Sequence, residues 1–259
     1  MGAKPEGTSC PSTETMEFHT GGGEAGGRWR LHRVVLVVLL WMNLHEHVAV
    51  VLRNQKVRTY GDNSRVTQVA NTVSIPTLTQ LTICFELQRQ SDKQDWWLFT
   101  YYNSNNTRAL SLGAVGNRMT MIINGKNCTT YSDLSPAYFT SQMKPVCVAW
   151  KSETGRMEVY LNGTYRPSSF YPSAGESVLG GGTFRLGGEP GFDGYIYNLR
   201  LWDRSMSEDE LKKLKCDAEG NVIDWDHSNW TIPETVAQTD TTLSCSTALT
   251  LRTPPEWAA

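Results

Sequence analysis

One stretch, residues 187–214, constrains the fold of this chain more than any other, because a glycine turn, an aromatic strand and a short helix follow one another in it. After Gly194, apolar and polar side chains alternate with the period of a half-buried strand. The apolar set falls on one face and the polar set on the other: Tyr195, Tyr197, Leu199 and Leu201 against Asn198 and Arg200. We therefore expect a sheet that is built around this strand.

A helix is predicted directly after the strand. Ser207 and Glu210 have the spacing of a capping box, in which each residue caps a backbone N–H of the other. Leu211 and Leu214 give this helix one narrow apolar edge, so we expect about two turns that lie on the sheet.

The rest of the domain also has the pattern of a β-sheet protein. Strand-like runs recur at nearly regular spacing, and two of them end in an Asn-Gly pair, Asn124-Gly125 and Asn162-Gly163. This pair is the strongest short-range signal for a hairpin turn. A chain of 259 residues could hold one large β domain or two small ones. We predict a single all-β jelly-roll sandwich with one short helix.

The chain divides into a lead, a domain and an end segment. Residues 1–47 are rich in glycine, so we predict a disordered lead, and its nine apolar residues at 34–42 follow arginines as in a signal peptide. This run is too short to span a bilayer, and a buried strand is the alternative interpretation. The domain covers residues 48–246, and residues 247–259 are predicted to begin a linker.

Five of the six cysteines fall inside the domain. Cys84 and Cys147 lie in strong predicted strands, and a bridge between them would stabilise the fold by about 4 kcal/mol in the chain-entropy model. Cys216 and Cys245 bracket a tail and would join its two ends. Cys128 is then left without a partner.

Four Asn-x-Ser/Thr sequons, at Asn105, Asn127, Asn162 and Asn229, accompany these cysteines. Asn162 is the most plausible glycosylation site because it lies at a predicted hairpin tip, and Asn127 is a weak one because a cysteine occupies its middle position. Together they favour a secreted or cell-surface glycoprotein, in which disulfides are stable. The net charge of −2 shows no electrostatic footprint for a nucleic-acid partner.

Several motifs resemble the pentraxin domain. They are the two cysteine-bearing strands, the run Cys147–Ser152, and the strand Gly194–Trp202 with its Ser-x-x-Glu. The pentraxin signature is His-x-Cys-x-Ser/Thr-Trp-x-Ser/Thr, from which this chain departs at Pro145 and Ala149. The resemblance covers about residues 54–226 and implies a pentraxin/laminin-G-like sandwich.

A further set of motifs is similar to the pentraxin-like module of adhesion G-protein-coupled receptors of subgroup G, and this similarity extends through the tail. The motifs are Val48–Val50, Leu52–Val57, Ser74–Pro76, Cys84–Glu86, Gly194–Asn198, Gly220–Trp225 and Leu243–Cys245. In such receptors a CUB domain precedes the module, and autoproteolytic and seven-helix domains follow it. We expect this chain to hold the module without those neighbours.

The resemblance also allows the calcium-binding loops of pentraxins to be compared with this chain. Pentraxins bind Ca²⁺ through an Asp-Asn pair on one loop and a cluster of acids on a longer loop after Leu-Gly. At these two places the present chain has Asn105-Asn106-Thr107 and, after Leu186-Gly187, the carboxylates of Glu189 and Asp193. Because Ca²⁺ takes about six to eight oxygen ligands, we expect no cofactor, with Glu189 and Asp193 as the candidate ligands should Ca²⁺ bind.

An enzyme is the third alternative, because sandwiches of this shape include glycosidases, which need two carboxyl groups across a cleft. Glu208, Asp209 and Glu210 are better explained as the first turn of a helix, and Asp224 and Asp226 lie in the tail. We predict no catalytic residues.

The sequence therefore predicts a non-catalytic extracellular binding and adhesion module of a receptor ectodomain. Its expected partner is an extracellular-matrix or cell-surface protein, with no nucleic acid and no direct membrane span in this chain. The alternative is a secreted calcium-dependent lectin of pentraxin type.

Overall fold

The computed structural model describes residues 49–62, 64–130, 136–167 and 172–246. The chain divides into two units, and all of these residues belong to the second, residues 47–259. The predicted lead, with its apolar run at 34–42, and the predicted linker at 247–259 lie outside the described residues.

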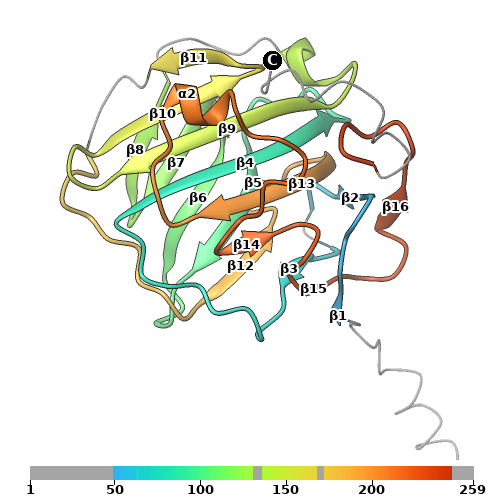
Figure 1. The fold of residues 1–259 in the computed structure, drawn as a ribbon, viewed down its shortest axis with the longest axis horizontal. Helices are drawn as coiled ribbons and strands as arrows, with labels where there is room; N and C mark the ends of the chain where they lie inside the picture. The colour runs from blue at the N-terminus through green and yellow to red at the C-terminus, as the bar shows by residue number, and fades with distance from the viewer. Residues whose placement is uncertain (1–48, 63, 131–135, 168–171, 247–259) are drawn as a thin grey trace, which may run out of the picture. The chain divides into compact units, whose positions relative to one another are not determined.

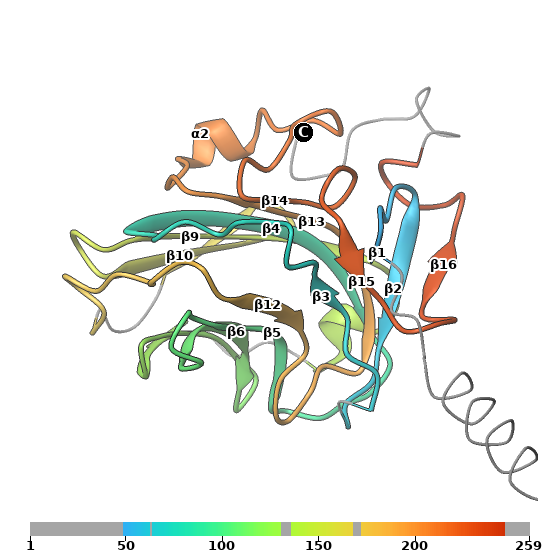
Figure 2. The same cartoon turned by 90° about the horizontal axis from the view of Figure 1, so that it is seen from below.

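Two antiparallel sheets face each other as a sandwich (Figure 1, Figure 2). In the described part of the chain each sheet has eight strands. Sheet A has the order β1 (Ala49–Val50), β15 (Trp230–Thr231), β3 (Gln68–Val69), β12 (Thr183–Leu186), β5 (Trp96–Tyr102), β6 (Arg108–Val115), β7 (Arg118–Ile123) and β8 (Lys126–Thr129). Sheet B has the order β11 (Thr164–Pro167), β10 (Arg156–Leu161), β9 (Lys144–Lys151), β4 (Gln80–Arg89), β13 (Gly194–Trp202), β2 (Gln55–Thr59) and β16 (Ala237–Thr239), with β14 (Ile223–Asp224) paired to β13. The predicted all-β sandwich is confirmed.

The hydrophobic core lies between the sheets and is filled by alternate side chains of the central strands. On β4 the core residues are Leu81, Ile83, Phe85 and Leu87. Cys84 lies between them in sequence but belongs to a second cluster, with Cys147, Tyr160, Trp202, Met206 and Leu211. This second cluster lies on the outer face of sheet B, the face turned away from sheet A.

The strand expected at residues 195–201 is β13, but the simple alternation is wrong about its faces. Tyr197 pairs with Glu86 of β4, and Arg200 pairs with Cys84. Glu86 and Cys84 are two residues apart on β4, so their side chains lie on the same face of the sheet. Their partners Tyr197 and Arg200 therefore also lie on that face, although they are three residues apart on β13. A β-bulge, with Asn198 at a φ of 55°, takes up the extra residue. β13 is therefore buried on both faces.

The predicted helix is present as α2 (Glu208–Leu211), which is one turn and not two. Its capping box forms as expected: the Ser207 hydroxyl accepts a bond from the Glu210 N–H, and the Glu210 carboxylate accepts one from the Ser207 N–H. Leu211 is buried, whereas Leu214 lies beyond the helix and is half-buried. Among the described residues there is also one 3₁₀ turn, Pro136–Phe139, and no helix is long and apolar enough to be a transmembrane segment.

Both predicted Asn-Gly turns form hairpins. They connect β7 to β8 and β10 to β11, and the residues of each pair have positive φ values: 47° and 80° at Asn124-Gly125, and 49° and 73° at Asn162-Gly163. The left-handed backbone matches the twist of the flanking strands.

The segment from Cys216 to Cys245, which we call the tail, returns across the sandwich and supplies strands to both sheets (Figure 2). β14 and β16 join sheet B, and β15 joins sheet A between β1 and β3. Trp225 and Trp230 are fully buried, with ring centroids 5.2 Å apart. The tail is therefore an integral part of the domain.

Candidate functional site

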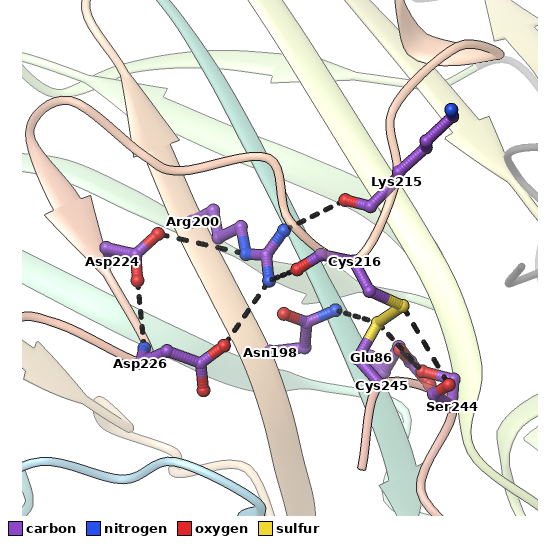
Figure 3. The surroundings of a disulfide bond; sticks show 9 residues. All are labelled: Glu86, Asn198, Arg200, Lys215, Cys216, Asp224, Asp226, Ser244 and Cys245. Carbon is purple, nitrogen blue, oxygen red and sulfur yellow. Dashed lines mark hydrogen bonds and ion pairs between the residues drawn. A yellow bond between two sulfur atoms is a disulfide. The ribbon is translucent and has the colours of Figure 1, made fainter. Parts of the chain in front are cut away.

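A cluster of buried polar side chains lies on the outer face of sheet B, beneath the tail (Figure 3). The bulge in β13 turns Arg200 to this face, where the tail passes over it. We call this cluster the tail lock, and it consists of Glu86, Asn198, Arg200, Asp224, Asp226 and Ser244 around the Cys216–Cys245 disulfide.

Arg200 is the centre of the tail lock. Its side chain is 3% exposed, and its guanidinium donates to the carbonyl oxygens of Lys215 at 3.2 Å and Cys216 at 2.7 Å. It also pairs with Asp224 at 3.8 Å and Asp226 at 3.5 Å. Burial raises the pKa of Asp226, and the nearby Arg200 charge opposes that rise. One cation therefore holds both the backbone and the acids of the tail.

Glu86 is the second buried charge of the lock. The Ser244 hydroxyl donates to its carboxylate, and the Asn198 side chain also hydrogen-bonds to it. Burial raises the pKa of Glu86, and these hydrogen bonds and Arg200 lower it again in part. Asn198 also donates to Sγ of Cys245 at 3.5 Å, so the lock contacts the disulfide itself.

The structure joins the two cysteine pairs that the sequence leads us to expect. Cys84 and Cys147 occupy directly paired positions of β4 and β9, with an S–S distance of 2.06 Å. Cys216 and Cys245 are linked with an S–S distance of 2.13 Å. Cys128 of β8 is free and fully buried, and its sulfur lies 3.2 Å from the Ser173 hydroxyl.

A hollow of about 470 Å³ opens beside Glu86, between residues 240–244 of the tail and residues 141–145. Lys56 and Asp240 form an ion pair of 2.7 Å on its wall. Hydrogen bonds from Lys56 and Thr242 lower the pKa of Asp240 to about 2. Two of the four charged side chains that line this hollow, Lys56 and Asp240, are thus paired with each other.

The residues expected to bind calcium are not brought together. Thr183 pairs with Tyr102 and Leu186 with Phe99, so the loop that carries Asn105 meets one end of β12, and Glu189 follows the other end. The carboxylate of Asp193 pairs with Arg58. In the part of the chain that the structure describes, no three His, Cys, Asp or Glu side chains are placed to hold a metal ion. These residues do not fit a calcium site of pentraxin type.

The carboxylates considered for catalysis are also separated. Asp224 is buried and accepts hydrogen bonds from the N–H groups of Gly220 at 2.8 Å and Asp226 at 2.9 Å. Glu189 is exposed on the loop between β12 and β13. Asp224 therefore organises the tail, and the two groups do not form a pair across a cleft.

The four sequon asparagines differ in exposure. Asn105, Asn127 and Asn229 are exposed, whereas Asn162 is half-buried and its Oδ1 is buried without a hydrogen-bond partner. In the sequence, the hairpin position of Asn162 favours it as a glycosylation site. In the structure this position leaves its side chain half-buried.

One feature of the candidate site has no clear signal in the sequence. Glu86 and Asn198 look like ordinary strand residues, and only the bulge in β13 and the returning tail bring them together. A polar Asn inside an aromatic strand is the one hint of the bulge.

Comparisons with known proteins agree with this architecture. The family model described as the concanavalin A-like lectin/glucanases superfamily matches residues 61–212. Adhesion G-protein coupled receptor G6 of the zebrafish Danio rerio is 39% identical over 219 residues, which cover 81% of this chain and 18% of that receptor. The sequence motifs also favour this sixth member within subgroup G.

Solved structures give the same result. The full extracellular region of zebrafish Gpr126/Adgrg6 matches with a TM-score of 0.68 and 37% identity, over 76% of this chain and 28% of that one. The native heptameric SAP-like pentraxin of Limulus polyphemus matches with a TM-score of 0.57 and 20% identity, over 74% of this chain and 95% of that one, and thereby shares its fold. The chain spans less than a third of the length of the receptor sequences that it matches.

Proposed function

Because this chain belongs to the concanavalin A-like lectin/glucanases superfamily, as a pentraxin-like domain, we propose that it acts as a non-catalytic extracellular binding module of adhesion-receptor type. In this role a cross-linked sandwich presents a surface to a matrix or cell-surface ligand. The observation that supports the proposal best is the tail lock. There the buried Arg200 pairs with Asp224 and Asp226, and these charges hold the tail to sheet B.

An extracellular setting is part of this proposal. Two disulfides in the described residues suit an oxidising compartment. The similarity to adhesion G-protein coupled receptor G6 also supports an extracellular location. We further infer that residues 34–42 serve as the core of a signal peptide and that the binding domain extends from 48 to 246.

Catalysis is not part of the proposed function, although the superfamily name includes glucanases. Glycoside hydrolysis needs a general acid and a second carboxylate facing the same bond. Asp224, the most buried of the acids considered, is occupied by backbone N–H groups and by His227. Incubation with a panel of glycans should therefore release no product.

The experiment that tests the module is a binding assay with the secreted chain on extracellular matrix deposited by cultured cells. We expect saturable binding that thermal unfolding abolishes. A variant with Cys216→Ala and Cys245→Ala serves as the matched control for a loosened tail. Absence of binding to any matrix or cell surface would contradict the proposal.

Light scattering after size exclusion separates the alternative, a calcium-dependent lectin of pentraxin type. A pentraxin should give a ring that calcium stabilises, whereas we expect a monomer with and without Ca²⁺, because Asp193 is paired with Arg58 and Glu189 lies apart from Asn105.

Glycosylation is proposed at the sequons, foremost at the exposed Asn105 and Asn229; Asn127 is also exposed but is a weaker site, because a cysteine occupies the middle position of its sequon. Asn162 should be occupied least, because its side chain is half-buried. Mass spectrometry of tryptic peptides before and after glycan removal would measure the occupancy of each site.

A further inference from the structure

The two disulfides of the described residues lie in different surroundings. Cys84 and Cys147 are 4% and 2% exposed, and they belong to the apolar cluster on the outer face of sheet B that also contains Met206 and Leu211. They are directly paired positions of β4 and β9, so the hydrogen bonds of the sheet hold the two residues together without the bridge. Reduction of this bridge would therefore release no segment of the chain.

The Cys216–Cys245 bridge, by contrast, joins two segments that lie outside the strands. Cys216 follows α2 and Cys245 follows β16, and both residues are half-buried. Cys216 lies between the exposed Lys215 and Asp217, on the side of the bridge that is closer to solvent. Among the described residues no strand pairing connects these two segments, so the bridge itself connects them.

Side-chain contacts hold the end of the tail beside this bridge. Asp240 pairs with Lys56 at 2.7 Å, and the Ser244 hydroxyl donates to the Glu86 carboxylate. These contacts can open one at a time, unlike the hydrogen bonds of a sheet, because each joins a single pair of residues. Residues 240–246 therefore depend on the bridge more than the strands of the tail do.

The two sulfur atoms of the bridge have unlike neighbours. Sγ of Cys245 accepts a hydrogen bond from the Asn198 amide at 3.5 Å (Figure 3), whereas Sγ of Cys216 lies 3.9 Å from the carbonyl oxygen of Ser244. An N–H group stabilises a thiolate and a carbonyl oxygen does not. Arg200 adds a positive charge beside the bridge, since it donates to the carbonyl oxygen of Cys216 at 2.7 Å. Cys245 is thus the better leaving group in thiol–disulfide exchange.

Glu86 acts in the opposite direction. Its carboxylate hydrogen-bonds to Asn198 and to Ser244, the residue next to Cys245, so a negative charge lies close to the sulfur that would leave. The amide of Asn198 has two hydrogens and can serve both the carboxylate and the sulfur. Removing Glu86 and removing the Asn198 donor should therefore change the rate of exchange in opposite directions.

We propose that the Cys216–Cys245 bridge is a redox switch, which a dithiol of the thioredoxin type opens while the domain stays folded. A thiolate of the dithiol attacks Sγ of Cys216 and forms a mixed disulfide, and the bridge breaks to leave Cys245 as a thiolate beside Asn198. The second thiol of the reductant then attacks the mixed disulfide and releases Cys216. The chain gains two electrons and two protons, and the dithiol becomes a disulfide.

Opening the bridge changes the hollow beside Glu86. Residues 240–244 form one wall of this hollow, and Leu243 in that wall is 3% exposed. Without the bridge this wall can move away from sheet B, which widens the hollow and exposes Leu243. This inference concerns the conformation of the domain and does not rest on the proposed binding function.

The first test measures which cysteines a dithiol reduces. The secreted chain with Cys128→Ala is incubated with reduced thioredoxin and stopped with acid, and free thiols and remaining disulfides are then labelled with two isotopes of N-ethylmaleimide. Peptide mass spectrometry should show Cys216 and Cys245 reduced together, at least about tenfold faster than Cys84 and Cys147. A thioredoxin that lacks its second cysteine should be trapped on Cys216. Equal rates for the two bridges, or trapping on Cys245, would overturn the proposal.

Two variants test the assignment of the leaving group. Asn198→Asp removes the amide donor but suits the φ of 55° at this position, and it should slow the reduction about fivefold. Glu86→Gln removes the opposing charge and should speed the reduction by a similar factor. Asn117→Asp is the matched control, because Asn117 also has a positive φ, of 63°, but lies in the turn between β6 and β7.

This control should reduce at the rate of the parent chain. Melting temperatures show whether each variant folds, and Glu86→Gln keeps the test valid if Asn198→Asp does not fold. A Glu86→Gln variant that is reduced no faster than the parent chain would refute the assignment of Cys245 as the leaving group.

Hydrogen exchange of the oxidised chain and of the reduced, alkylated chain tests the change of conformation. Protection should be lost at residues 240–246 and kept in β4 and β9. Identical exchange in the two forms would show that the bridge switches nothing. Loss of protection in β4 as well would show that reduction unfolds the domain, and this result would also overturn the proposal.

Discussion

The outer faces of the two sheets use charged residues in opposite ways. On sheet B, α2 and the tail cover the outer face, and its arginines meet acids: Arg58 with Asp193, Arg156 with Glu158, and Arg200 with Asp224 and Asp226. On sheet A, Arg108 and Arg185 meet aromatic rings and, among the described residues, no carboxylate.

This difference bears on stability. A buried arginine whose partners are all internal contributes to folding and offers nothing to a ligand. Arg185 is exposed, lies 5.5 Å from the centroid of the Tyr102 ring and has no ion pair among the described residues, so the fold depends on it little. Substitutions in the tail lock should therefore change stability far more than substitution of Arg185.

The largest effect is expected at Arg200. Arg200→Met leaves Asp224 and Asp226 buried without their cation, and loss of one partner of a buried pair typically costs about 3–5 kcal/mol. Urea unfolding measures the free energy of unfolding. Arg204→Met is the control, because Arg204 and Glu210 are 48% and 46% exposed and such pairs contribute about 0.5 kcal/mol. Equal effects of the two variants would refute the role given to the tail lock.

Removal of the Cys216–Cys245 bridge should have the next largest effect. The bridge closes a separation of 29 residues, which corresponds to about 3.5 kcal/mol in the chain-entropy model. In the double alanine variant, hydrogen exchange should show lost protection in the tail first, with β5 and β6 still protected.

Cys128→Ala is the control for this experiment, because it removes a buried sulfur without breaking a bridge. It should cost about 1 kcal/mol and leave tail exchange unchanged. Uniform loss of protection across both sheets in the bridge variant would show that the tail is not a separate cooperative unit.

A smaller effect is expected from the pH dependence of Glu86. Since burial raises its pKa, the folded state binds this proton more tightly than the unfolded state, and stability falls as the pH rises from about 4.3, the usual pKa of a glutamate, through the raised value. Glu86→Gln should therefore be more favourable relative to the parent chain at pH 7 than at pH 4.

Asp240→Asn should show the opposite pH dependence of stability. Its pKa is lowered to about 2, so its contribution to stability is present above the usual pKa of an aspartate and disappears as the pH falls through about 2. This variant should be less stable than the parent chain at pH 7, and the gap should narrow in acid. Parallel pH profiles of the two variants would contradict both assignments.

The smallest effect on stability is expected on sheet A. Arg185→Gln changes an exposed side chain with no ion pair among the described residues, so the free energy of unfolding should stay within about 0.5 kcal/mol of the parent chain. A loss as large as that of Arg200→Met would mean that the two faces do not differ in the way described.

Local patterns in the sequence were sufficient for much of the fold. Three features depend only on residues a few positions apart, so a short segment of sequence is enough to predict them. They are the Asn-Gly turns, the capping box at Ser207 and the alternation on β4. The two cysteine pairs lie in or beside such elements. The helix was predicted too long because Leu214 packs on the sheet without helical backbone.

The candidate sites depended on contacts between residues that are far apart in the sequence, which local patterns do not predict. Strict alternation assigned Tyr197 and Arg200 to opposite faces, and the bulge at Asn198 placed them on the same one. Asn162 was favoured for glycosylation because of its turn, but its exposure depends on how the hairpin packs.

The sequence by itself thus determined the class of fold and the positions of turns, strands and cysteines, because backbone preference and side-chain period are local properties. Only the tertiary structure decided which charges are neutralised. Glu86 meets Ser244 across 158 positions in the chain, whereas Arg108 stacks on Trp97 and donates to the Ser111 hydroxyl. Partner and dielectric environment come from the packing of distant segments, and these set what a charged side chain can do.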